Sequence, residues 1–221
     1  MLRSTRRNFI FNFLLVANLI IANKPSIAKQ TLFVGAIPDQ NPERLNRLYQ
    51  LLCDELEKEL QVSVRYLPVT NYAAAVSAFR TGSLDLVWFG GLTGVQARTQ
   101  KPGAQVLAQR DIDLQFQSVF IANTASQIPI IKTQSELKVL KGKRFSFGSE
   151  SSTSGRLMPQ HFLHKAGVNM NDFKGRRPGF SGSHDATIAL VQSGSYEAGA
   201  LNKQVWEARL RAGRIDRTKV R

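Results

Sequence analysis

From residue 31 onward, the pattern of apolar and polar positions predicts strands and helices in alternation. Residues 31–36 form a short apolar run that predicts a buried strand, and leucines recur at helical spacing across residues 45–60. Residues 62–67 alternate as a strand does, residues 71–80 predict an alanine-rich helix, and residues 84–89 predict another buried strand. This order predicts an α/β lobe whose sheet is sandwiched between helices.

The rest of the chain continues this pattern after two predicted extended segments, at residues 105–108 and 117–122. The helix and strand signals then alternate again, with helices expected at 134–140, 154–166, 185–192 and 203–211 and strands at 144–148 and 196–201. We therefore expect two similar α/β lobes, one spanning residues 29–118 and the other residues 119–221.

The first 28 residues have the pattern of an export signal. Arg3, Arg6 and Arg7 form a positive end, residues 9–22 are almost wholly apolar, and the segment ends in the small-residue sequence Ser-Ile-Ala. The apolar run is shorter than the roughly 20 residues of a membrane-spanning helix. Residues 1–28 therefore predict a signal peptide and periplasmic localisation, and the paired arginines leave both the Sec and the twin-arginine export routes open.

The net charge of the chain restricts the classes of partner that we expect. Residues 1–28 carry four basic and no acidic residues, so the formal net charge of +14 falls to +10 without them. Such a surplus favours small anions, nucleic acid or anionic lipid as partners, or is a basic surface without a specific partner, and export argues against chromosomal DNA. Cys53 is the only cysteine, which excludes an intramolecular disulfide and a zinc ribbon, and its apolar neighbours predict a buried thiol.

Four consecutive hydroxyl residues lie between a predicted strand and a predicted helix, at residues 151–154. Ser152, Thr153 and Ser154 offer hydroxyl donors beside free backbone N–H groups at a helix start, which is suited to a phosphate-like oxyanion. Helix capping is the alternative, because serine and threonine are also preferred caps.

A second polar cluster opens the next helix, in the glycine-flanked sequence of residues 179–185. His184 offers a hydrogen bond or a positive charge to an anion, or is an exposed loop residue, and Asp185 is expected to cap the helix. Tyr72, at the start of the helix predicted in the first lobe, either reaches a ligand with its hydroxyl or packs in the core.

Together these segments resemble the phosphonate and phosphite family of ABC-importer binding proteins. The resemblance covers residues 34–221 and rests on the order and spacing of four short sequences, GSLDL at 82–86, STSG at 152–155, FSGSHD at 180–185 and AGALN at 198–202. The sequences of residues 89–97 and 148–151 look closer to a branch labelled putative selenate importers.

The resemblance implies the type II periplasmic binding-protein fold, in which two α/β lobes surround a cleft. It implies that Ser152, Thr153, Ser154 and His184, with Asp185 beside them, hold the oxyanion and that Tyr72 closes over it from the opposite lobe. Family members continue past the position of the last residue and return to the first lobe, so we expect this chain to lack a C-terminal part, which leaves the first lobe incomplete.

Two departures from the family pattern concern the ligand. Family members often have a tyrosine at the position of Gly94, and binders of aminoalkyl phosphonates carry an acid where this chain has Gln204. The resemblance therefore favours a small tetrahedral oxyanion without an amine, such as phosphite, methylphosphonate or selenate.

The resulting functional hypothesis is an exported, monomeric substrate-binding component of an ABC importer. Its expected partners are the oxyanion, a permease and its ATPase, and it meets the membrane only through that permease. We expect no enzymatic activity, cofactor or metal. The alternatives are an anion-sensing domain of a signalling system and an exported Ser/His hydrolase, although the chain has no Gly-x-Ser-x-Gly sequence.

Overall fold

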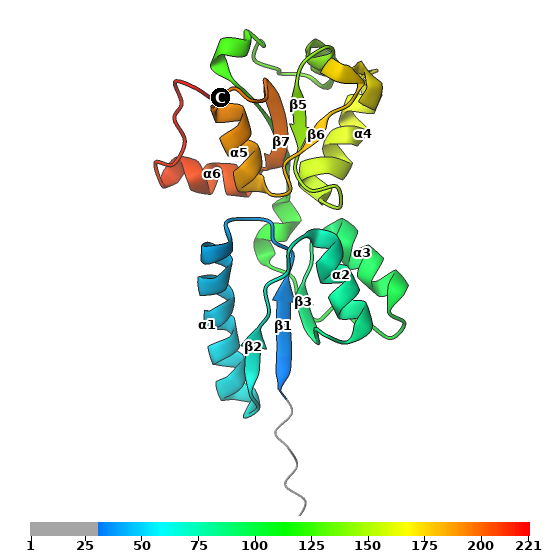
Figure 1. Cartoon of the computed structure of the whole chain (residues 1–221), viewed down its shortest axis with the longest axis vertical. Helices are drawn as coiled ribbons and strands as arrows, with labels where there is room; N and C mark the ends of the chain where they lie inside the picture. Colours follow the sequence, from blue (N-terminus) through cyan, green and yellow to red (C-terminus); the bar gives the residue numbers. More distant parts are fainter. Residues whose placement is uncertain (1–30) are drawn as a thin grey trace, which may run out of the picture.

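The computed structural model describes residues 31–221, which form two α/β lobes joined by a single extended linker (Figure 1). The predicted signal peptide, residues 1–28, lies outside the described residues. No helix within residues 31–221 combines the length and the apolar character needed to cross a membrane.

Lobe 1 is built on a three-stranded parallel sheet in which β1 lies between β2 and β3. Its elements are β1 (Leu32–Ala36), α1 (Pro42–Leu60), β2 (Val64–Tyr66), α2 (Tyr72–Thr81), β3 (Leu86–Trp88) and α3 (Gly91–Gln100). The predicted β-α-β-α-β order is confirmed, and α3 is an addition that the sequence pattern did not predict.

Local capping explains where the helices of lobe 1 begin and end. The Asn41 side chain accepts a hydrogen bond from the Arg44 amide at the start of α1, and Asn71 does the same for the Ala74 amide at the start of α2. Helix α2 ends at Gly82, whose φ of 80° is readily adopted only by a residue without a β-carbon.

Lobe 2 has a four-stranded sheet in the order β4-β7-β5-β6, with β4 antiparallel to β7 and the other pairs parallel. Its strands are β4 (Ser118–Ala122), β5 (Phe145–Phe147), β6 (Gly179–Phe180) and β7 (Ala198–Asn202). Its helices are α4 (Met158–Lys165), α5 (His184–Gln192) and α6 (Lys203–Arg211), and 3-10 turns lie at Thr124–Ser126, Gln134–Leu140, Met170–Asp172 and Lys174–Arg176. The backbone of Arg221 pairs with Ala122 and extends the sheet at the free edge of β4.

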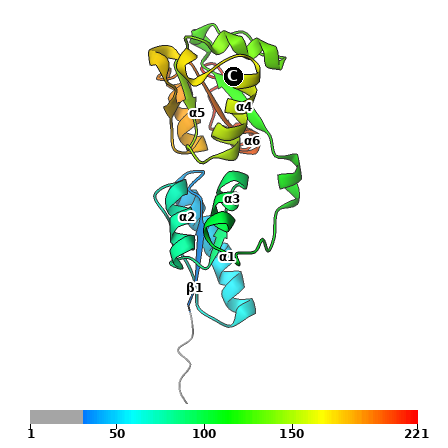
Figure 2. The same ribbon diagram turned by 90° about the vertical axis from the view of Figure 1, so that its right-hand side faces the viewer.

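The linker leaves lobe 1 after α3 and runs along one side of the molecule to β4 (Figure 2). It contains a 3-10 turn, Asp111–Gln115, that is closed by an ion pair of 2.6 Å between Arg110 and Asp113. Residues 105–108, predicted to be extended, pair with no strand in the described part of the chain.

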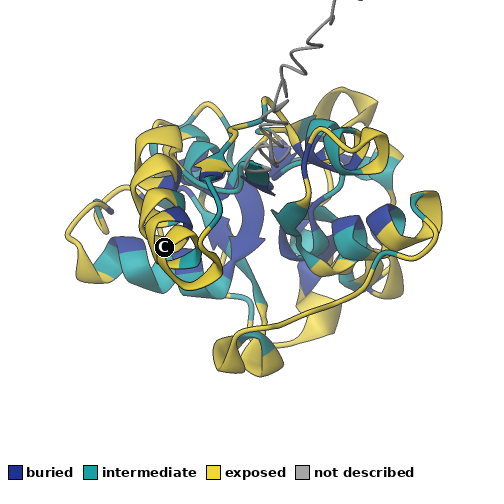
Figure 3. Ribbon diagram, turned by 90° about the horizontal axis from the view of Figure 1, so that it is seen from below, coloured by how far each residue is buried: buried dark blue, intermediate teal, exposed yellow. Residues whose placement is uncertain are grey.

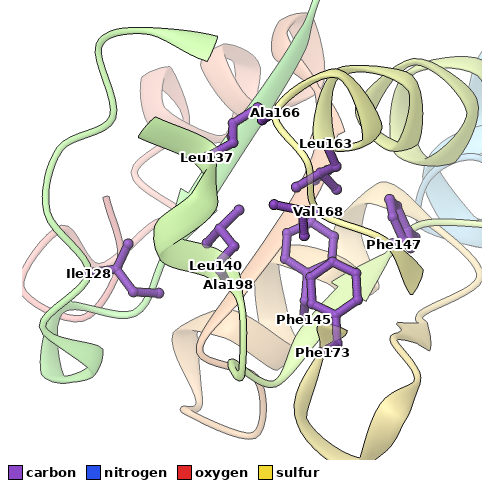
Figure 4. Close-up of a cluster of buried hydrophobic side chains, with 11 residues drawn as sticks. Ile128, Leu137, Leu140, Phe145, Phe147, Leu163, Ala166, Val168, Phe173 and Ala198 are labelled. Carbon is purple, nitrogen blue, oxygen red and sulfur yellow. The ribbon is translucent and has the colours of Figure 1, made fainter. Parts of the chain in front are cut away.

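The main hydrophobic core lies in lobe 2 (Figure 4). Phe145 of β5 is fully buried and stacks on Phe173, with 4.9 Å between ring centroids, and it meets Phe147 edge to face. In lobe 1 the strands and a few residues of α1 are buried, among them Cys53 as predicted, while the outer helix faces and the linker are exposed (Figure 3). On the lobe 2 side, the strands β5 and β7 that lead to the cleft are therefore packed into the largest core cluster.

Candidate functional site

A cavity of about 1000 Å³ lies between the two lobes. Lobe 1 contributes the segments that follow β1 and β3 together with the start of α2, and lobe 2 contributes the turn after β5 and the starts of α5 and α6. Five of the six residues proposed from the sequence line this cavity: Tyr72, Ser152, Thr153, Ser154 and His184.

The turn after β5 is a tight structure in which Ser152 acts as the N-cap. Its hydroxyl accepts a hydrogen bond of 3.0 Å from the Gly155 amide, and the Gly155 carbonyl accepts one of 2.9 Å from the Gly148 amide. The next residues, Thr153–Leu157, form one π-helical turn before α4 begins, so the predicted helix at 154–166 starts irregularly. A β-carbon on Gly155 would come within 3.3 Å of the His184 ring, so the absence of a side chain there lets His184 approach the hydroxyl cluster.

The three hydroxyl groups of this cluster have different partners. The Thr153 hydroxyl oxygen accepts a hydrogen bond of 2.9 Å from the Leu92 amide, across the cleft at the start of α3. Tyr72, also in lobe 1, lines the same cavity and lies close to the Ser152 side chain. The Ser154 hydroxyl is buried and has no hydrogen-bond partner within residues 31–221, although most buried polar groups in native proteins have one.

His184 is buried and neutral. Burial lowers the pKa of its imidazole to about 4, because the charged form loses its hydration. Its Nδ1 accepts a hydrogen bond of 3.4 Å from the Asn202 amide, which leaves Nε2–H as the donor of the neutral ring. The burial of His184 contradicts the alternative of an exposed loop residue, and its lowered pKa favours the neutral, hydrogen-bonding form over the positive charge near neutral pH.

Asp185 differs from the other five proposed residues because it does not line the cavity. Ser183, and not Asp185, is the N-cap of α5, since its hydroxyl accepts from the Ala186 amide. The predicted capping role was therefore wrong, because α5 already begins at His184 and its N-cap lies two positions before Asp185. The Asp185 carboxylate instead binds Arg209 and the Asn41 amide.

The sequence analysis missed Asp39, which lines the cavity from lobe 1. Burial raises the pKa of its carboxyl to about 6, despite the opposing effect of a hydrogen bond from Gln40 and of the Arg110 charge. The only signal for Asp39 in the sequence is the polar run that follows the first predicted strand. Among the charged residues around the cavity, five are basic and three are acidic: Arg44, Arg98, Lys101, Arg110 and Arg211 against Asp39, Asp85 and Asp113.

This arrangement is suited to holding an anion, and it lacks the orientation that a hydrolase would need. In a Ser-His-Asp triad the acid holds the imidazole by its Nδ1. Here Nδ1 of His184 accepts from a backbone amide, and the neighbouring Asp185 carboxylate is held by Arg209. The residues that the structure describes contain no group of three metal-ligating side chains.

Comparison with known families assigns the chain to one of them. The family of periplasmic substrate-binding proteins of phosphonate ABC transporters matches residues 34–221. The chain belongs to this family. The expected family resemblance is thereby confirmed, and the family consists of transport proteins that bind a substrate.

Individual relatives agree with this assignment. PhnD1 of Prochlorococcus marinus (strain MIT 9301), described as a probable ABC transporter phosphite binding protein, is 60% identical over 182 residues, which cover 82% of this chain and 61% of PhnD1. The chain thus spans about three fifths of the length of this relative.

Solved structures confirm the predicted fold of type II periplasmic binding proteins. The structure of PhnD1 in complex with methylphosphonate has a TM-score of 0.84 at 56% identity and covers 87% of this chain and 71% of PhnD1. A binding protein of a phosphonate ABC transporter from Pseudomonas aeruginosa has a TM-score of 0.67 at 20% identity, covers 82% of this chain and 60% of that one, and shares the fold alone. None of these three descriptions mentions selenate, so the proximity to a selenate branch stays a prediction.

Proposed function

We propose that this chain is the exported substrate-binding component of an ABC importer and that it holds a small tetrahedral oxyanion of the phosphite or methylphosphonate class between its lobes. The unpartnered, buried Ser154 hydroxyl carries this proposal, because a bound oxyanion would supply the missing acceptor. Thr153 and the neutral His184 line the same cavity and add further polar groups.

The proposed binding mechanism begins with the hydroxyl cluster of lobe 2. An oxyanion that enters the open cleft accepts hydrogen bonds from the Ser154 hydroxyl and from Nε2–H of His184. Closure then brings Tyr72 of lobe 1 towards Ser152 and removes water, which strengthens each hydrogen bond to the charged ligand. The closed monomer in the periplasm would deliver its ligand to a permease driven by an ATPase.

A ligand without an amine is favoured by the state of Gln204. This residue lines the cavity where an acid would neutralise an amine, and its amide donates a hydrogen bond of 2.9 Å to the Ile112 carbonyl of the linker.

Titration calorimetry tests the proposal directly with phosphite, methylphosphonate, 2-aminoethylphosphonate, phosphate, sulfate and selenate. We expect measurable affinity for phosphite or methylphosphonate and weaker binding of the amine-bearing ligand. The absence of binding to all six, in protein shown to be folded, would refute the proposed function.

A single hydroxyl deletion tests the site itself. Ser154→Ala should weaken binding of the preferred ligand about 10-fold, because one ligand oxygen loses its donor, while the free energy of unfolding should stay the same or rise. Ser135→Ala, at an exposed hydroxyl on lobe 2, is the matched control and should change neither quantity. Equal affinity of the wild type and Ser154→Ala would remove this hydroxyl from the site.

A further inference from the structure

The start of α5 faces the cavity and the opposite lobe at the same time. His184 lines the cavity, and its backbone amide donates a hydrogen bond of 3.0 Å to the Asp39 carbonyl in lobe 1. The next residue, Asp185, accepts a hydrogen bond of 2.8 Å from the Asn41 amide, also in lobe 1. Two consecutive residues of lobe 2 therefore contact the segment that leads into α1.

Arg209 of α6 completes this contact. Its Nε and Nη2 bind the two carboxylate oxygens of Asp185 at 2.6 and 2.7 Å, a bidentate pair. Nη2 also donates to the Gln40 side chain in lobe 1 at 3.3 Å. The pair is formed within lobe 2, and both of its members also bind lobe 1.

Burial distinguishes this ion pair from those on the surface. The side chains of Arg209 and Asp185 are 10% and 24% exposed, against 42% and 43% for Lys203 and Glu207 on the same helix. Burial alone would raise the pKa of the Asp185 carboxyl, but the hydrogen bonds from Arg209 and from the Asn41 amide outweigh it and hold that pKa below its usual value. The carboxylate is thus charged and well partnered in the closed arrangement, whereas exposed pairs contribute little.

We propose that Asp185 and Arg209 form an inter-lobe latch, in which their hydrogen bonds to Asn41 and Gln40 of lobe 1 stabilise the closed form. Closure of the lobes then also fixes the position of the adjacent His184. Asp185 is then a positioning residue that acts through its neighbour and need not touch the ligand. This inference rests on the proposed function for its effect on anion binding, but the latch itself can be tested without any ligand.

Ligand kinetics provide the first test, with methylphosphonate as the probe. Asp185→Asn keeps the size of the side chain but removes the charge, so the closed form should be less populated. We expect dissociation to be about 10-fold faster with little change in the association rate, because the cavity residues are intact. Glu55→Gln, which breaks the exposed pair of Glu55 with Lys58 on α1 outside the cavity lining, is the control and should leave both rates unchanged.

Amide hydrogen exchange in the ligand-free protein separates a latch from a local structural role. The Leu92 amide binds Thr153 across the cleft, on segments that contain none of the latch residues. If Asp185 only supports its own surroundings, Asp185→Asn should accelerate exchange at Asn41 alone. A latch predicts faster exchange at Asn41, His184 and Leu92 together, since all three amides bind across the lobes.

The outcomes decide the proposal whether or not methylphosphonate binds. Unchanged exchange at His184 and Leu92 in folded Asp185→Asn overturns the latch even if the wild type binds the ligand. Faster exchange at all three amides supports it even if the proposed function fails. If the variant does not fold, exchange in the wild type decides the question. A latch requires the His184 and Leu92 amides to become exposed in the same opening event and therefore to show equal protection from exchange. Unequal protection of these two amides overturns the proposal.

Discussion

The two lobes bury their hydrophobic residues to very different extents. Within the described residues, lobe 2 has one cluster of 11 buried residues and another of six, whereas the two clusters of lobe 1 hold three each. In lobe 1, Leu48 and Leu60 of α1 are 45% and 52% exposed although they belong to the helical leucine pattern. Lobe 2 therefore has the larger hydrophobic core, and lobe 1 has the smaller one.

The site follows this division of the molecule. Ser152, Thr153, Ser154 and His184 all lie on lobe 2, at the ends of strands or the starts of helices anchored by the larger core. Lobe 1 contributes Tyr72, Asp39 and backbone groups such as the Leu92 amide. We propose that lobe 2 sets the geometry of the anion site and that lobe 1 controls its closure.

The largest expected effect comes from the core of lobe 2. Phe145→Ala should lower the free energy of unfolding by about 3 to 5 kcal/mol, because Phe145 is fully buried between other rings. Chemical denaturation followed by circular dichroism measures this loss. The same substitution at the linker residue Phe116, which is 38% exposed, should cost about 1 kcal/mol or less. Equal losses at the two positions would contradict the unequal packing of the lobes.

Much of this architecture could be predicted from local sequence patterns. The strands and helices that follow a clear period were predicted, and the helix expected at 203–211 coincides with α6. Helix α3 was missed because Gly91 and Gly94 weaken its helical signal, and its first turn is fixed by the distant Thr153. Strand β6 was missed because two residues are too few to show a pattern.

The residues around the cavity were predicted where a local pattern or the family resemblance marked them, as for the hydroxyl run, His184 and Tyr72. The hydroxyl run indicated an anion site because three of its members lie side by side in the chain. The contact between Asp185 and Asn41 joins residues 144 positions apart, and no local sequence pattern predicts such a pair. Asp39 was missed for the same reason, since only the folded chain brings its carboxyl into the cavity.

A smaller effect is expected from the lobe 1 side of the site. Tyr72→Phe keeps the buried ring but removes the hydroxyl that lies close to Ser152 across the cleft, so methylphosphonate affinity should fall about 3- to 5-fold, less than for Ser154→Ala. Calorimetry measures the change. Tyr66→Phe, on a ring stacked against Tyr49 outside the cavity lining, is the control and should bind normally. A larger loss for Tyr72→Phe than for Ser154→Ala would reverse the roles assigned to the lobes.

Asp39 should make binding depend on pH. Its pKa is raised by burial to about 6, so the carboxyl is mostly ionised at pH 7.5 and mostly protonated at pH 5.5. An ionised carboxylate repels an anion in the same cavity, and affinity should therefore rise as the pH falls through 6. Of the groups around Asp39, Arg110 and Arg209 stay charged, and the lowered pKa of Asp185 keeps it ionised across this range.

Asp39→Asn isolates this effect from the titration of the ligand. We expect the variant to bind methylphosphonate about 2- to 3-fold more tightly than the wild type at pH 7.5 and equally at pH 5.5. Comparing the two proteins at each pH cancels changes in the ligand's own charge, and His184, with a pKa of about 4, stays neutral throughout. A ratio of affinities that does not vary with pH would show that Asp39 does not act on the anion.

The smallest effect is expected on the outer face of α1. Leu51→Gln should change the free energy of unfolding by no more than about 0.5 kcal/mol, because Leu51 is 68% exposed and loses little burial. Leu45→Gln, on the same helix but only 4% exposed, is the matched comparison and should be clearly destabilising, since it buries an amide without partners. Chemical denaturation of the two variants gives both values. A loss above about 1 kcal/mol for Leu51→Gln would mean that this face is covered in solution, and dependence of that loss on protein concentration would identify a second copy of the chain as the cover.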